Sequence, residues 1–86
     1  MEKISASLET IAETVEKNAD VSKTDTAIKS ARNLIKDQAS PMLKELDKEL
    51  ATWQLKLSVI LKETVGKKGM AKHARFWAEK LREARV

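Results

Sequence analysis

The chain has 86 residues, with 17 lysines and arginines, 13 acidic residues and a formal net charge of +4. This length supports one hydrophobic core, so we expect a single helical-bundle domain over residues 1–86. The absence of cysteine excludes disulfides and thiolate metal sites. No apolar stretch approaches the roughly 20 residues of a transmembrane helix, and the first residues lack the apolar core of a secretory signal. The composition therefore predicts a cytoplasmic protein.

The composition also selects the type of secondary structure. Alanine, leucine, lysine and glutamate, which favour helices, are abundant. Two glycines, one phenylalanine and no tyrosine leave little material for strands and tight hairpins. We expect an all-α fold.

The first predicted helix has four apolar residues spaced by four, three and four positions, which places them on one face: Ile4, Leu8, Ile11 and Val15. Asn18 is a suitable residue to end it, because asparagine tolerates the left-handed conformation.

The second predicted helix begins at a capping box formed by Ser22 and Asp25 and ends near Ala39. Its apolar stripe contains Ile28, Ala31 and Ile35, widened by Ala27 and Leu34.

Ser40 and Pro41 mark the start of the next helix, as N-cap and first helical residue. A long central helix is expected over roughly 41–65. Its main seam alternates spacings of three and four: Leu43, Leu46, Leu50, Trp53, Leu57 and Ile60. Ala51, Leu55, Val59 and Leu61 make its other faces apolar, and a helix that is apolar all round is usually buried on several sides.

Gly66 or Gly69 is expected to supply the left-handed cap that ends this long helix. The last helix follows, with a stripe of Met70, Ala74, Trp77, Leu81 and Ala84. Phe76 lies one position off that stripe.

Four amphipathic helices with short connections predict a small antiparallel helical bundle. Residues 41–65 would span about 37 Å, whereas the other helices would span about 24 Å. Part of the long helix would then lack partners, which predicts self-association, with a two-fold dimer favoured. The alternative is that the short helices stack end to end along the long one.

The sequence offers no catalytic or metal-binding pattern. His73 is the only histidine, and no acidic residue lies three or four positions from it. Met70 occupies the position where a di-iron Glu-x-x-His pair would need glutamate. We therefore expect neither enzymatic activity nor a metal or cofactor.

The positive charge is concentrated in the last quarter of the chain. Residues 66–86 contain seven basic and two acidic side chains, while residues 1–65 carry a net charge of −1. Such asymmetry indicates an anionic partner. The candidate binding residues are Lys67, Lys68, Lys72, Arg75 and Phe76.

A protein–protein interaction module, such as an adaptor, an inhibitor or an assembly subunit, is the leading functional hypothesis. An aromatic side chain beside basic residues is a common interface anchor. The alternative is a nucleic-acid-binding accessory protein that contacts phosphates without reading bases. A membrane surface is a third option, which Glu79 and Glu83 weaken, and the charges could also serve only to solubilise the helix.

Overall fold

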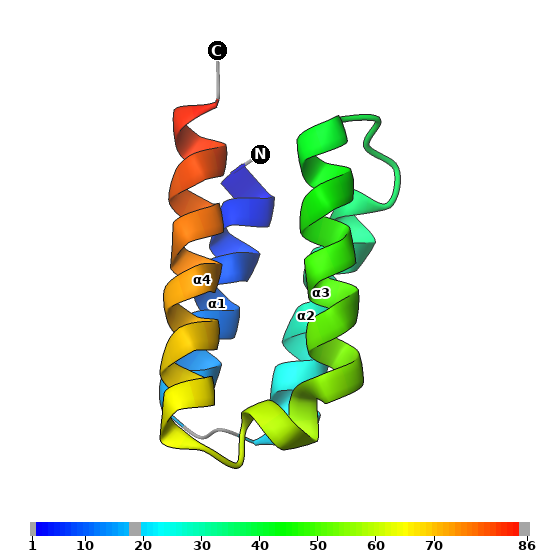
Figure 1. Cartoon of the computed structure of the whole chain (residues 1–86). Coiled ribbons are helices and arrows are strands. Elements are labelled where there is room, and N and C mark those ends of the chain that lie inside the picture. The colour runs from blue at the N-terminus through cyan, green and yellow to red at the C-terminus, as the bar shows by residue number, and fades with distance from the viewer. Residues whose placement is uncertain (1, 18–19, 85–86) are drawn as a thin grey trace.

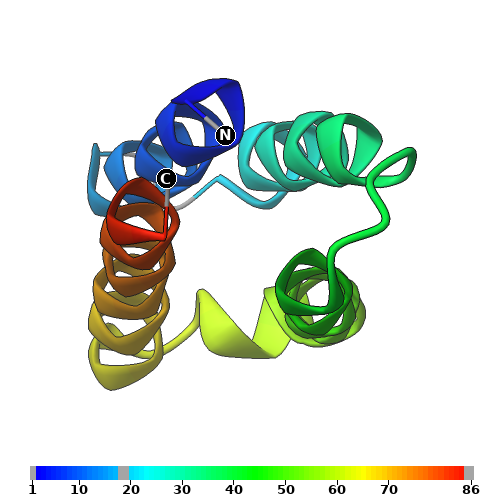
Figure 2. The ribbon, with the colours of Figure 1, turned by 90° about the horizontal axis from the view of Figure 1, so that it is seen from above.

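The computed structural model describes residues 2–17 and 20–84, and this part of the chain contains four helices and no strand. The helices are α1 (Glu2–Lys17), α2 (Val21–Ile35), α3 (Pro41–Ile60) and α4 (Thr64–Glu83). The predicted all-helical fold is confirmed. Figure 1 shows the chain descending through α1, rising through α2, descending through α3 and rising through α4. Seen from above, the helices stand around a square in chain order, with α4 beside α1 (Figure 2).

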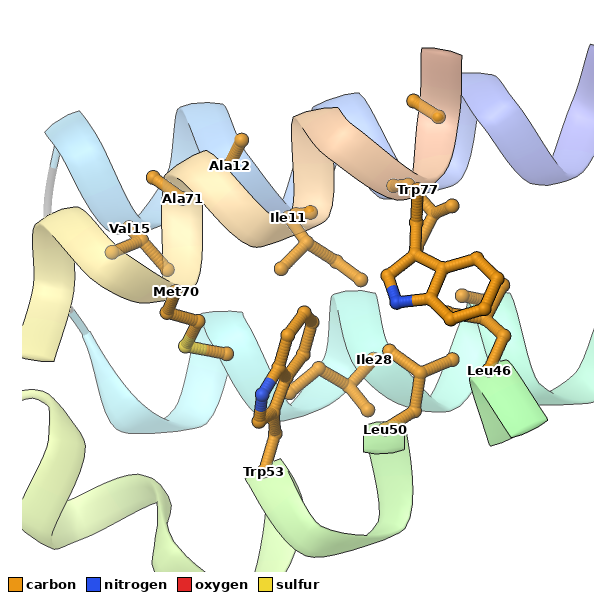
Figure 3. Close-up of a cluster of buried hydrophobic side chains, with 14 of the residues drawn as sticks. Ile11, Ala12, Val15, Ile28, Leu46, Leu50, Trp53, Met70, Ala71 and Trp77 are labelled. Carbon is orange, nitrogen blue, oxygen red and sulfur yellow. The ribbon is translucent and has the colours of Figure 1, made fainter. Parts of the chain in front are cut away.

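The core forms where the four predicted apolar stripes meet. Its larger members are Ile4, Leu8, Ile11, Val15, Ile28, Ile35, Leu43, Leu46, Leu50, Trp53, Leu57, Leu61, Met70, Trp77 and Leu81. Figure 3 shows Trp53 from α3 and Trp77 from α4 entering the same cluster as Ile11 and Ile28. The spacing of apolar residues therefore identified the buried face of each helix.

The helix ends agree with the sequence only in part. Ser40 caps α3 as predicted, because its hydroxyl accepts a hydrogen bond from the Leu43 N–H at 3.5 Å. The capping box at Ser22 is wrong: Asp20 caps α2 and accepts from the Ser22 N–H at 2.8 Å. This helix ends at Ile35 rather than near Ala39. The predicted stop at Asn18 lies outside the described residues.

The prediction of one long helix over 41–65 is also wrong, because α3 ends at Ile60. Leu61 keeps helical angles, but Glu63 is extended and α4 starts at Thr64. Gly66 and Gly69 lie inside α4 and supply no left-handed cap. Since α3 and α4 contain 20 residues each, and α1 and α2 contain 16 and 15, α3 is not longer than all of its companions, which was the basis for predicting self-association.

The break after Ile60 has a tertiary cause. The break lets α4 turn back and pack along α1. There α4 buries an apolar stripe of Met70, Ala71, Ala74, Trp77, Ala78 and Leu81. Three of these residues are alanines, which permit close approach of the two helices. Burying this stripe outweighs the few backbone hydrogen bonds that a continuous helix would add, because each is worth only about 1 kcal/mol net.

The outer face of α3 differs from the expectation. Leu55 is 87% exposed and Val59 is 61% exposed, although both were predicted to be buried. In the square arrangement α3 packs mainly on α2 and touches α4 only lightly. Its far side therefore faces outward, and α3 is not a central helix. Among the described residues, no helix has the length and apolarity needed to cross a bilayer.

Candidate partner-binding surface

A basic groove lies where the C-terminal end of α1 meets the N-terminal half of α4. Its walls are formed by Val15, Glu16, Lys17, Thr64, Lys67, Lys68, Lys72 and Arg75. Lys68, Lys72 and Arg75 follow one another at spacings of four and three, so they share one face of α4. Four of the five candidate residues from the sequence thus line a single groove.

Arg75 is the member of this groove whose charge is already matched. Its guanidinium forms a two-pronged ion pair with the Glu16 carboxylate, with Nη2 to Oε1 at 2.8 Å. The hydrogen bonds from Arg75 hold the pKa of Glu16 below its ordinary value, and the same pairing raises the pKa of Arg75. Arg75 therefore holds α4 against α1 at the wall of the groove, and its charge is already used by Glu16.

A second ion pair repeats this pattern two turns away. Arg82 of α4 pairs with Glu9 of α1, so the last helix is held to the first along one flank. Seven residues separate the two glutamates and seven separate the two arginines, which is the spacing of two helical turns. Glu9 and Glu16 of α1 thus neutralise arginines of α4.

The lysines of the groove carry unmatched charge. Within residues 2–17 and 20–84, no carboxylate forms an ion pair with Lys17, Lys67, Lys68 or Lys72. The groove also borders the start of α4, where Glu63 makes no side-chain capping bond and the helix dipole is positive. Four lysines without an ion pair are therefore gathered at one end of the bundle.

Lys17 lines the groove, but the sequence did not identify it as a candidate binding residue. It occupies the last turn of α1 and looks like an ordinary solvated residue there. Only the packing of α1 on α4 brings it to the groove, and the spacing within one helix carries no signal of that contact.

Phe76 lies on the neighbouring flank of α4 and is 53% exposed. Its ring stacks on His73 with centroids 5.6 Å apart, and the Lys80 ammonium lies 5.7 Å from its centroid. Together with Gly69, Lys72 and His73 it lines a shallow depression. Because Lys72 lines both hollows, the basic groove and the Phe76 depression form one continuous surface.

His73 has an acidic partner that its own helix does not supply. Its Nδ1 lies against the Glu49 carboxylate of α3, and the Trp77 indole N–H donates to the same carboxylate at 3.1 Å. Trp53 faces His73 from α3 with ring centroids 6.3 Å apart. This cluster joins α3 to α4 and holds the ring on which Phe76 stacks. Among the described residues, no group of three histidine, aspartate or glutamate side chains is placed to hold a metal ion.

Comparison of the chain with family models, with curated proteins and with solved structures found no significant match.

Proposed function

We propose that this chain is a non-enzymatic interaction module that binds an acidic segment of a protein partner. The binding surface is the basic groove together with the Phe76 depression. The observation that carries the proposal is the unmatched charge of Lys17, Lys67, Lys68 and Lys72, beside arginines that α1 has already neutralised. A carboxylate-rich segment complements these lysines.

Phe76 favours a protein over a nucleic acid that is bound through its phosphates alone. Contacts to phosphates need only cations, whereas a half-exposed aromatic ring beside Lys72 suits an apolar side chain of a peptide. The up-and-down course of the helices in Figure 1 supports an antiparallel bundle as the rigid scaffold beneath this surface.

The alternative function is phosphate binding by a nucleic-acid accessory protein. The uncapped start of α4 favours it, because free backbone N–H groups and lysines at a helix N-terminus suit phosphate oxygens. Such binding would weaken steeply with salt, since each neutralised phosphate releases a counterion.

The test measures binding of a labelled glutamate-rich peptide with one central leucine, and of mixed-sequence duplex DNA and single-stranded RNA. We expect the peptide to bind and the Lys67→Ala/Lys68→Ala variant to weaken it about tenfold, with Phe76→Ala weakening it further. The control is Lys36→Ala/Lys44→Ala, which removes the same charge at the opposite end of the bundle. Equal loss in both double variants would contradict the proposal, and binding of nucleic acid alone would establish the alternative.

Sedimentation velocity on the same samples measures self-association. The sequence analysis predicted self-association from a long helix over 41–65, and α3 is shorter than that. A two-fold dimer through the groove would bring its lysines together, so added salt would strengthen that dimer. A monomer leaves the groove open to a partner.

A further inference from the structure

The apolar seam of α3 continues in the same register into α4, across the turn that separates the two helices. In α3 the seam runs from Leu43 to Ile60 at alternating spacings of three and four. The alternation continues after Ile60 through two polar residues, Thr64 and Lys67. It then reaches four buried residues of α4: Ala71, Ala74, Ala78 and Leu81. If the turn were helical, the buried stripes of α3 and α4 would therefore lie on one face of a single helix.

The turn itself consists of three residues, 61–63, and none of them is glycine or proline. Leu61 keeps helical angles, the Lys62 N–H bonds to the Val59 carbonyl at 3.2 Å, and Glu63 is extended. The Glu63 side chain does not cap α4. A break between two helices leaves backbone carbonyls and N–H groups without helical partners on its two sides. A continuous helix would pair them.

The packing of α4 on α1 is what keeps the turn bent. α4 lies mainly against α1 and touches α3 only lightly. A single chain cannot combine this packing with a continuous helix, because a straight helix carries α4 away from its own α1. Two chains can combine them, if α4 of each chain packs on α1 of the other. Such an exchange of identical elements is a low-cost route to a dimer.

We infer that residues 61–63 are a hinge, and that two copies of this chain exchange α4 to form a two-fold dimer in which residues 41–83 are one continuous helix. The two long helices lie side by side and run in opposite directions, as α3 and α4 do in Figure 1. The hinge lies at the end of the bundle opposite the start of α1 and the end of α4, so these ends do not obstruct the second copy. Lys62 and Glu63 balance each other in charge where the two hinges meet.

The exchanged dimer remakes the contacts of α4 between the two copies. Glu16 and Glu9 of one copy pair with Arg75 and Arg82 of the other, in place of the pairs within one chain. Each basic groove then contains Lys17 from one copy and the lysines of α4 from the other. The exchange leaves these grooves open, and the inference does not depend on the proposed function.

Two hinge variants should have opposite effects on the dimer. Gly66→Ala obstructs the closed turn, because its Cβ would lie 2.5 Å from the Ile60 carbonyl oxygen, whereas alanine favours a continuous helix. It should raise the dimerisation constant about tenfold or more. Thr64→Pro suits the closed turn, where Thr64 is the first helical residue and Glu63 is extended, but proline inside a continuous helix clashes with the carbonyl four residues earlier. It should abolish the dimer.

Sedimentation velocity over a range of protein concentrations measures both effects, after refolding from urea at high concentration. Gly69→Ala is the matched control, because a Cβ there meets nothing within 4 Å and favours α4 equally in both forms. It should leave the dimerisation constant unchanged.

A mixing experiment distinguishes the exchange from any other dimer. The variants Glu9→Arg/Glu16→Arg and Arg75→Glu/Arg82→Glu each set like charges between α1 and α4 of the same chain. An exchanged dimer with one chain of each kind restores opposite charges in both halves. Native mass spectrometry of the two variants refolded together should therefore show mainly mixed dimers, and Thr64→Pro in both chains should prevent them.

Three results would each overturn the inference: a folded Gly66→Ala chain that stays monomeric, a dimer that Thr64→Pro leaves intact, or a refolded mixture without mixed dimers. If circular dichroism shows that Gly66→Ala does not fold, the mixing experiment still decides, because its two variants keep the natural hinge.

Discussion

The Ser5 hydroxyl in α1 donates a hydrogen bond to the Ala78 carbonyl in α4 at 3.2 Å, across 73 positions of sequence. Ser5 is completely buried, and α4 carries buried alanines at Ala74 and Ala78 on this side. This bond lies on the α1–α4 interface that positions the basic groove. The small side chains there let α4 return along α1, so the interface should be sensitive to both polarity and size.

Replacing Ser5 tests that interface. Ser5→Ala removes the hydrogen bond and should lower the free energy of unfolding by about 1 kcal/mol. Ser5→Leu adds volume where two helices approach closely and should cost about 1–3 kcal/mol or more. Urea unfolding followed by circular dichroism measures both. Ser7→Ala on the same helix is the control, and a loss as large as that of Ser5→Ala would show that the buried bond is unimportant.

Replacing each of the two glycines of α4 with alanine should change the free energy of unfolding in opposite directions. A Cβ on Gly66 would lie 2.5 Å from the Ile60 carbonyl oxygen, so Gly66→Ala must displace the turn between α3 and α4 and should cost about 1–3 kcal/mol. A Cβ on Gly69 meets nothing within 4 Å, so Gly69→Ala should stabilise the helix by about 0.5–1 kcal/mol. Thermal unfolding of the two variants provides the comparison, and equal shifts in Tm would contradict this account of the turn.

Thr24 offers a stabilising substitution. Its side chain is completely buried, and its hydroxyl oxygen has no hydrogen-bond partner among the described residues. Thr24→Val keeps the shape and removes the buried polar group, so it should raise the free energy of unfolding by about 1 kcal/mol. Thr26→Val, at an exposed hydroxyl that bonds to the Ser22 carbonyl at 3.0 Å, is the matched control. A loss of stability at Thr24 alone would mean that its hydroxyl has a partner after all.

Stability should fall in acid, partly through two carboxylates. Hydrogen bonds from Arg75 lower the pKa of Glu16, and those from Gln54 and Lys29 lower the pKa of Asp25. A carboxylate with a lowered pKa in the folded state stabilises the protein above its unfolded pKa. That contribution is lost as pH falls through the folded value, below the ordinary values of 4.5 for Glu16 and 3.8 for Asp25.

Urea unfolding from about pH 7 to about pH 3 measures this loss. Glu16→Gln/Asp25→Asn retains oxygen acceptors for the same donors but does not titrate, so its stability should decline less steeply below pH 4.5. A decline identical to that of the natural chain would show that neither pair contributes.

Much of the fold could be predicted from local chemistry. The apolar spacing identified the buried faces, and Ser40 with Pro41 fixed the start of α3, because capping and side-chain periodicity depend on neighbours within a few residues. Lys68, Lys72 and Arg75 line one groove for the same reason, since spacings of four and three place residues on one face of any helix. Lys67 also lines the groove, but it lies next to Lys68 in the sequence and not on that face. That these residues bind a partner stays a prediction.

The order of charged and apolar residues by itself determined that the chain is helical, where its helices bury their apolar stripes and where unbalanced positive charge collects. Tertiary structure decided the turn after Ile60, the exposure of Leu55 and Val59, the partners of Arg75 and His73, and the arrival of Lys17 at the groove. No residue between Leu61 and Glu63 breaks a helix by its own preference. The chain turns there because folding α4 back onto α1 buries more apolar surface than a longer helix would, and only contacts between distant segments carry that energy.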